Sequence, residues 1–541
     1  MSRKRSSAAL AAALLVACGC ARASGGTSGA RHPWTHPGVL RLADIAEPDS
    51  LNPLLSTMDL SYDLSSLVFS YLVIADASGA LIPDLATAVP SRTNGGISAD
   101  GRTVTYHLRP NVRWHDGAPL DARDVAFSWR VVMNPRNNIL HREGYEEVVN
   151  IVTPDAGTVV VHLRRRYPPF VTQFFTTLQE GAKPIVPAHL LARYAEINDV
   201  PFNAAPVGSG PFRFVRWDRG KAIVLERNDA YYRGRPRLDG IVLNVLPDQN
   251  TVADSLQAHE IDLVVNGNPQ MYVRFHGAPG IADRLTPWNA LRLVMFDDQR
   301  PAMRDVNVRR ALSMAVDVRT LIDKLSFGTG TPTGELAAPT SIGYAQLPPY
   351  RYDPAAARAL LERSGWRLRP DGVRARDGVP LDLLFVVSAG GDEQRFAVQI
   401  QAMLAQIGAR VTIKTYPYRG IFAWDGPIVR GRFDLSVYGN TLNYDPDSTS
   451  TLGCDEFVPK GENEARFCDP RVDALEREGL STDDPVRRAA IYHAIGRRVH
   501  DAVPYLPLYL RRRISVYNDD LHGYDPAPIA APWWNAWQWS I

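Results

Sequence analysis

The sequence predicts an α/β protein that folds as several packing units. A length of 541 residues corresponds to about two to four units at roughly 100 to 200 residues each. Hydrophobic residues make up 45% of the chain and charged residues 22%, which excludes a disordered, strongly charged polymer. From residue 291 onward, apolar runs of strand length alternate with apolar residues at helical spacing. This alternation favours a mostly parallel sheet covered by helices.

Before residue 291 the pattern predicts mainly strands and two helices. Asp121 caps the second helix, because Asp124 at the third helical position can complete a capping box. Val125, Trp129 and Val132 share one face of that helix, so we expect them in the core. The predicted strands cover residues 39–44, 103–108, 155–163, 212–217, 222–227 and 241–246, and the first helical pattern covers residues 61–74.

After residue 291 the helix signals are capping residues and glycine stops. Asp305 caps one helix, Asp353 and Pro354 start a second, and Gly365 ends it. A third helix carries apolar residues at Phe396, Ile400, Met403 and Ile407, and the intervening strands cover residues 291–296, 381–387 and 411–413. In such a sheet the ligand crevice is expected at the carboxyl ends of the strands.

Several classes of chemistry are excluded by composition and motif. Sixty Lys+Arg against 58 Asp+Glu give a net charge of +2, which excludes a basic nucleic-acid binder. No GxxxxGK[ST], HExxH, GxSxG or CxxC motif occurs, so the local signatures of nucleotide, zinc-protease, serine-hydrolase and redox sites are missing. His32 and His36 have helical metal-site spacing, but Pro33 disfavours the helix. We therefore predict no metal and no cofactor.

The N-terminus predicts export. Arg3, Lys4 and Arg5 precede an uncharged apolar run at residues 8–17, which is too short to span a bilayer permanently. Residues 15–18 (LVAC) resemble the lipobox of bacterial lipoproteins, which implies a signal peptide at 1–17, an acylated Cys18 and a flexible tether at 18–37. The alternative is a soluble secreted protein that has lost Cys18. Cys20 could be a second acylation site, a free thiol or the true cleavage site.

The other two cysteines, Cys454 and Cys468, enclose a polar loop. Outside the cytoplasm nothing keeps such a pair reduced, so we predict a disulfide that pins a surface loop. A metal pair is the competing interpretation. It is disfavoured because no His or further Cys lies near at ligand spacing.

Four segments of the chain carry motifs whose order along the sequence matches that of a known family. They are residues 106–129 (YHLRPNVRWHDGAPLDARDVAFSW), 206–261 (beginning PVGSGPFRFVRW), 305–317 (DVNVRRALSMAVD) and 432–468, which ends in the Cys pair. Together they resemble the extracytoplasmic solute-binding proteins of peptide-type ABC importers, the oligopeptide- and dipeptide-binding group of family 5. The resemblance covers essentially the whole mature chain. Trp114 and Trp129 match tryptophans of that family that are mainly structural.

The resemblance implies a two-lobed periplasmic-binding-protein fold, type II-like, with an accessory domain. The first lobe would be discontinuous, with parts at 38–74, 206–286 and 505–541, the accessory domain at 75–205 and the second lobe at 287–504. Such a protein is not an enzyme. It is a monomer that closes on an oligopeptide-like solute and delivers it to an ABC permease with its ATPase subunits, in the periplasm or at the cell surface.

The ligand residues depart from the family pattern. Peptide-binding members carry an Asp that pairs with the peptide's terminal ammonium, and here Asn443 occupies that position while Asn440 replaces the preceding Trp. Either Asp445 or Asp447 has taken the role, with Asp445 favoured, or the ligand has no free amino terminus. Tyr418 matches an aromatic residue that lines the family's cleft. We also count Tyr438, in the strand before the loop, as a candidate ligand contact.

Two other functions remain open from the sequence. One is an oligosaccharide or other small-solute binding protein of the same fold. The other is a secreted hydrolase that uses Asp445 and Asp447 as paired carboxylates. These aspartates flank Pro446, and in such a turn carboxylates more often cap backbone N–H groups than perform catalysis.

Overall fold

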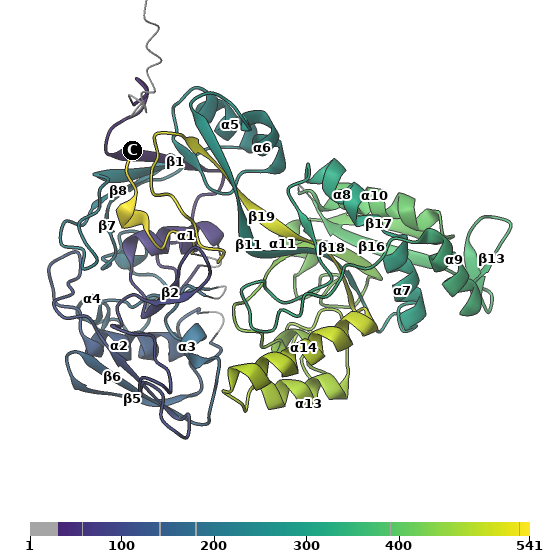
Figure 1. The fold of residues 1–541 in the computed structure, drawn as a ribbon, viewed down its shortest axis with the longest axis horizontal. Helices are drawn as coiled ribbons and strands as arrows, with labels where there is room; N and C mark the ends of the chain where they lie inside the picture. The colour runs from purple at the N-terminus through teal and green to yellow at the C-terminus, as the bar shows by residue number, and fades with distance from the viewer. Residues whose placement is uncertain (1–30, 57, 140–141, 179–180, 390, 530) are drawn as a thin grey trace, which may run out of the picture.

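Two bodies joined by two long strands make up the molecule (Figure 1). The computed structural model describes residues 31–56, 58–139, 142–178, 181–389, 391–529 and 531–541. The joining strands are β11 (Ile281–Phe296) and β19 (Tyr505–Asn518), which pair antiparallel from Ile281 opposite Asn518 to Met295 opposite Tyr505. The predicted α/β, two-lobed fold class is confirmed.

A single mixed sheet of eleven strands continues through both bodies. Its main path runs β17 (Arg410–Tyr416), β16 (Asp382–Ser388), β18 (Leu435–Thr441), β11, β19, β10 (Leu263–Val264), β1 (Val39–Asp44), β9 (Gly240–Val245), β8 (Ala222–Arg227) and β7 (Phe212–Asp218), and β12 (Thr331–Pro332) adds to β19. In the second body β16 is parallel to both β17 and β18, but β11 is antiparallel to β18 and to β19. The expectation of a mostly parallel sheet was therefore too simple, because the chain enters the second body along β11 and leaves it along β19.

The ladder between β11 and β19 is interrupted where the strands pass from one body to the other. Its register shifts between Pro287 and Leu291. Proline has no N–H to donate, and the Asn289 amide instead donates to the Pro528 carbonyl at 2.9 Å while the Asn289 carbonyl accepts from Leu442 at 2.7 Å. The strand predicted at residue 291 actually begins at Ile281, because this interruption hides the first half of β11 from a pattern search.

Helices pack around the sheets of both bodies (Figure 1). They are α1 (Asp59–Val68), α2 (Ala122–Met133), α3 (Phe170–Gln173), α4 (Ala188–Leu191), α5 (Gln249–Gln257), α6 (Pro269–Phe275), α7 (Val306–Ala315), α8 (Val318–Leu325), α9 (Pro354–Arg363), α10 (Glu393–Ala405), α11 (Tyr418–Ile421), α12 (Thr449–Leu452), α13 (Pro470–Gly479) and α14 (Pro485–Ala502). The capping box predicted at Asp121 and Asp124 is present at the start of α2. Among these helices of the described chain, none is long and apolar enough to cross a membrane.

The helix predicted over residues 61–74 is wrong in its second half. α1 ends at Val68, and Phe69 is extended. The following residues form β2 (Val73–Ala75), which pairs with β3 (Leu81–Pro83), and the Leu72 amide donates to the Phe175 carbonyl at 2.8 Å. Pairing with distant segments overrides the local helical periodicity here.

Each body has its own apolar core. The core of the first body includes β1, β8 and β9 together with a three-stranded sheet of β4 (Thr103–His107), β6 (Thr158–Leu163) and β5 (Val148–Asp155). In the second body successive residues of a strand enter different cores, since Phe385 packs under α7 to α10 while Val386 faces the α13–α14 side. A small sheet of β13 (Arg367–Leu368), β14 (Arg374–Arg376) and β15 (Val379–Pro380) lies beyond α9.

The two bodies also touch away from the joining strands. Arg92 Nε donates to Asp483 Oδ2 at 2.5 Å, and Arg166 lies 3.6 Å from the same carboxylate, which belongs to the turn between α13 and α14. The Tyr444 amide donates to the Leu178 carbonyl at 3.3 Å. In this conformation the bodies are therefore in contact at places other than the β11–β19 connection.

Residues 31–37 are not part of a free tether. Arg31 donates to the carbonyl of the C-terminal Ile541 at 2.9 Å, and the His32 amide donates to Asp520 at 2.8 Å. The expected tether boundary at 37 is thus too late, because carboxylates and carbonyls of the C-terminal segment bind these residues. The expected signal peptide, Cys18 and Cys20 lie outside the described residues.

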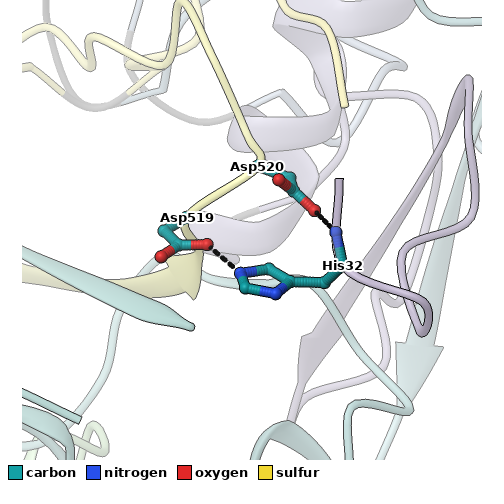
Figure 2. A group of neighbouring side chains, drawn as sticks. All are labelled: His32, Asp519 and Asp520. Carbon is teal, nitrogen blue, oxygen red and sulfur yellow. Dashed lines mark hydrogen bonds and ion pairs between the residues drawn. The ribbon is translucent and has the colours of Figure 1, made fainter. Parts of the chain in front are cut away.

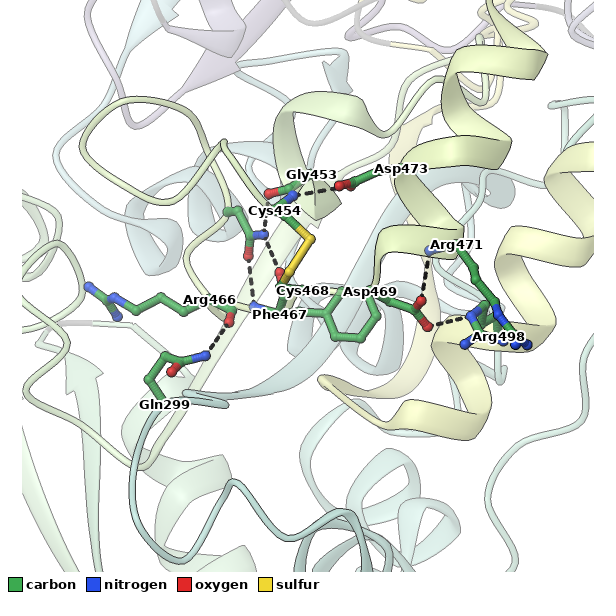
Figure 3. The surroundings of a disulfide bond; sticks show 11 residues. Gln299, Gly453, Cys454, Arg466, Phe467, Cys468, Asp469, Arg471, Asp473 and Arg498 are labelled. Atoms are coloured by element: carbon green, nitrogen blue, oxygen red, sulfur yellow. Dashed lines mark hydrogen bonds and ion pairs between the residues drawn. A yellow bond between two sulfur atoms is a disulfide. The ribbon is translucent and has the colours of Figure 1, made fainter.

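A disulfide joins Cys454 and Cys468 and closes the loop before α13 (Figure 3). Inside the loop the fully buried Asn463 donates to the carbonyls of Gly453 and Phe467 at 2.9 and 2.7 Å. Asp469, next to the disulfide, caps α13 through the Arg471 amide at 2.9 Å. Asn463 therefore ties together the two ends of the loop that the cross-link closes.

Replacing both cysteines by serine should lower the free energy of unfolding by about 3 kcal/mol, since a loop of roughly fifteen residues would regain its freedom in the unfolded chain. Urea unfolding of parent and double variant measures this difference. Thiol titration of the denatured, unreduced protein is the control: two free thiols at these positions would contradict the cross-link.

Candidate functional site

A cavity of about 320 Å³ lies in the second body beside the interrupted ladder. Strands β11, β16, β18 and β19, the start of α10 and the end of α11 all contribute to its wall. The lining residues are Arg292, Ser388, Gly391, Asp392, Glu393, Ile421, Phe422, Ser436, Val437, Tyr438, Gly439 and Arg511. Ser388 ends β16 and Gly439 is near the end of β18, so the cavity opens at the carboxyl ends of parallel strands.

One wall carries a nearly buried ion pair. Arg292 on β11 is 6% exposed, and its Nη1 donates to Glu393 Oε1 at 2.5 Å. Burial alone would raise the pKa of Glu393, but the neighbouring Arg292 outweighs burial and leaves that pKa below its usual value. The Arg292 guanidinium also lies 5.1 Å from the centroid of the Phe396 ring. This pair is charge-balanced.

A second arginine on the wall is not balanced in this way. The guanidinium carbon of Arg511 on β19 lies 4.7 Å from the centroid of the Trp288 ring, and that of Arg513 lies 5.1 Å from the same ring. Burial and the nearby Arg292 charge lower the pKa of Arg511. Trp288 belongs to the interrupted segment of β11, so the indole and the arginines mark the point where the two bodies are joined.

Tyr438 is the predicted ligand residue that lines this cavity, among those whose side chains the structure describes. Its hydroxyl lies 3.2 Å from Glu464 Oε2 and 3.8 Å from Met295 Sδ. Burial raises the pKa of Tyr438 well above its usual value, so the hydroxyl is a neutral donor. What Tyr438 offers the cavity is therefore its ring, which meets Phe422 edge-on at 6.0 Å.

The two amide candidates, Asn440 and Asn443, are not among the described residues of the lining. Tyr418 begins α11, and its side chain is outside the described part of the structure. Asn440 lies one residue past Gly439 on β18, opposite Leu291. Asn443 is exposed in the loop that follows, where it has a polar partner of its own.

Asp445 and Asp447 are close together, but both carboxylates are occupied. Arg488 of α14 donates to both oxygens of Asp445, at 2.8 and 2.7 Å, and Asp445 is 8% exposed. Asp447 accepts from the amide and the hydroxyl of Thr449 at 3.1 and 2.6 Å. The expected use of Asp445 as an ammonium anchor does not match this geometry, since its charge is already compensated inside the protein.

A group of three potential metal ligands lies elsewhere, at the N-terminal end of the described chain (Figure 2). His32 Nε2 lies 2.6 Å from Asp519 Oδ1, and Asp520 accepts from the His32 amide and from the Thr35 hydroxyl. These hydrogen bonds fasten the segment to the end of β19. His36, which sequence spacing paired with His32, is not in the group.

Sequence reasoning missed the arginines of the cavity, although a signal existed. Arg511, Arg512 and Arg513 are consecutive within an apolar run, where one charge would already be unusual. Because side chains of a strand alternate, the first and third must share a face, and in the structure both contact Trp288.

A family model of the bacterial extracellular solute-binding proteins, family 5 (middle part), matches residues 80–455. The nickel-binding periplasmic protein of Escherichia coli K12 is 31% identical over 495 residues, which span 89% of this chain and 90% of that protein.

Solved structures agree with this match. The oligopeptide-binding protein AppA of Bacillus subtilis, in complex with a nonapeptide, superposes with a TM-score of 0.77 at 25% identity and covers 93% of this chain and 99% of that one. NikA of Brucella suis, in complex with Fe(III)-EDTA, superposes with a TM-score of 0.81 at 25% identity, with the same two coverages.

These proteins bind and present solutes for ABC importers and are not enzymes, which removes the hydrolase alternative. The cavity described above lies in the second body, beside the joint of the two bodies. The chain belongs to the bacterial extracellular solute-binding proteins of family 5.

Proposed function

We propose that this chain captures a peptide-like solute outside the cytoplasm and delivers it to an ABC permease, while a lipid on Cys18 holds it at the membrane. The observation that carries this proposal is the cavity of about 320 Å³ beside the β11–β19 joint. Its wall combines aromatic rings with a few charged groups, as sites for small solutes do.

Closure of two lobes is the proposed working motion. The lobes are the ones expected from the sequence, with 38–74, 206–286 and 505–541 in one and 287–504 in the other, and residues 75–205 as an accessory domain. The interruption of the β11–β19 ladder at Pro287 lies at the boundary between them and supports a hinge there. A solute that contacts both lobes favours the closed state over the open one.

The charges of the wall support a solute with ends of opposite sign. Arg511 supplies a positive charge from β19, and Asp392 and Glu393 supply negative charges from the start of α10. Glu393 is neutralised by Arg292, whereas the ion pair of Asp392 in the described part of the chain is with the exposed Arg395, at 3.2 Å. An exposed pair of this kind is weak, so Asp392 remains able to receive an ammonium group.

A metal chelate is the second candidate, because relatives that bind nickel and Fe(III)-EDTA are as similar to this chain as the peptide-binding ones. The described lining contains no His or Cys. A bare transition metal would lack its preferred ligands there, so a metal would have to arrive inside a chelate.

Asp445 is proposed to be structural. Its bidentate pair with Arg488 ties the loop after β18 to α14, and Asp447 orders the start of α12. The amino-terminal recognition of a peptide is then independent of Asp445.

Native mass spectrometry of gently purified protein tests the main proposal. We expect an added mass that disappears on denaturation and matches a short peptide or a metal chelate. Protein that carries no added mass and binds neither a dipeptide pool nor Fe(III)-EDTA in calorimetry would contradict the proposed function.

Asp445→Asn should lower the free energy of unfolding by about 3 to 5 kcal/mol, because Arg488 would keep a buried charge without its partner. Asp447→Asn is the matched control and should cost less, about 1 kcal/mol, since the amide oxygen can still accept from Thr449. Urea unfolding gives both values.

Calorimetry with a bound peptide and its acetylated form should give the same ratio of affinities in parent and Asp445→Asn. If the parent prefers the free peptide and Asp445→Asn binds both forms equally, Asp445 is the anchor for the peptide's ammonium group.

Cys18→Ala should release the protein from the membrane fraction or block its processing, because the acylated residue would be gone. Fractionation of cells that express parent or variant measures this, with Cys20→Ala as the control that should stay membrane-bound. Normal maturation and membrane association of Cys18→Ala would contradict the anchor.

A further inference from the structure

Strand β19 places three consecutive arginines in three different environments. Arg511 lines the cavity, Arg512 is exposed on the opposite face and lies 3.5 Å from the Thr331 hydroxyl, and Arg513 is 2% exposed. Arg513 donates to the Ile529 carbonyl at 2.9 Å. Because side chains alternate along a strand, Arg511 and Arg513 both reach Trp288 while Arg512 faces away.

Arg511 lacks a partner of opposite charge in the described part of the chain. No carboxylate there lies within 4 Å of its guanidinium, whereas Arg292 holds Glu393 and Arg395 holds Asp392. The acidic groups that act on Arg511 from farther away are Glu393, at the start of α10, and Asp59, at the start of α1. A cation in a cavity without a close counter-ion is costly, unless an anion is bound there.

The contact that Arg511 does make leaves its donors available. A guanidinium that lies over an indole uses its flat face, and its N–H groups point outward in the plane. That edge has the geometry for two parallel hydrogen bonds to a carboxylate. A side chain at position 439 would place its Cβ 3.4 Å from Arg511 Nη1, so the glycine there keeps the space beside the guanidinium edge open.

We infer that Arg511 is a specificity-determining residue that binds a carboxylate of the solute. The inference rests on the proposed function and names the chemistry of its ligand. Both candidate solutes satisfy it, because a peptide ends in a carboxylate and a chelate such as Fe(III)-EDTA carries several. A neutral oligosaccharide does not satisfy it.

The test compares Arg511→Gln, Arg511→Lys and Arg512→Gln with the parent protein in calorimetry. The probes are a dipeptide pool, the same dipeptides as C-terminal amides, and Fe(III)-EDTA. For the probe that the parent binds, Arg511→Gln should weaken binding by roughly 30-fold or more, because a charged hydrogen-bonded pair is lost. The affinity of Arg511→Lys should lie between those of the parent and Arg511→Gln, because lysine keeps the positive charge but cannot donate two parallel hydrogen bonds. Arg512→Gln should bind as the parent does.

A double-mutant cycle identifies the carboxylate itself. Amidation of the peptide should cost the parent about as much as the Arg511→Gln change does, and should cost Arg511→Gln little more. Binding of Fe(III)-EDTA with the same Arg511 dependence, and of no dipeptide, would support the carboxylate anchor and identify a chelate as its source.

Melting curves without ligand separate this role from a structural one. Arg511→Gln should melt at the same temperature as the parent or higher, because it removes a half-buried charge that has no close counter-ion. A lower melting temperature with unchanged affinity, or equal affinity of parent and Arg511→Gln for any bound probe, would overturn the inference and leave the proposed function intact. A parent protein that binds no probe and carries no solute would overturn both.

Discussion

The antiparallel pairing of β11 with β19 is the constraint on which the rest of the structure depends. These strands are the backbone connection through which one sheet extends into both bodies, and they must stay paired on each side of the joint. Pro287 and Asn289 interrupt the pairing at the joint itself, and a second register shift follows between Arg292 and Leu293. If solute binds in the cavity beside this joint, as we propose, binding depends on the relative position of the two bodies.

Charge placement around this joint separates structural from functional groups. Asp445 with Arg488 and Arg292 with Glu393 are buried pairs whose members neutralise each other. Such pairs fix geometry and leave little charge for a ligand. Arg511 differs because its close contact is the face of Trp288, and its charge is left to be neutralised by something that enters the cavity.

More of the fold than of the candidate site could be predicted from the sequence. Local signals such as the capping box at Asp121 and Asp124 identify helix starts directly, and four collinear segments identify the family. The halves of β11 and the end of α1 at Val68 were not predictable, because long-range pairing decides them. The role of Asp445 was not predictable for a related reason. Its carboxylate is occupied by Arg488 of α14, which lies 43 residues later in the chain.

The central claim is that solute binds at the joint of the two bodies, against β19. A crystal structure of the protein purified with its own solute tests this most directly. The account predicts density in the cavity lined by Arg292, Tyr438 and Arg511, with a carboxylate at hydrogen-bond distance from the Arg511 guanidinium. Density for the solute on another surface, with only water in this cavity, would contradict it.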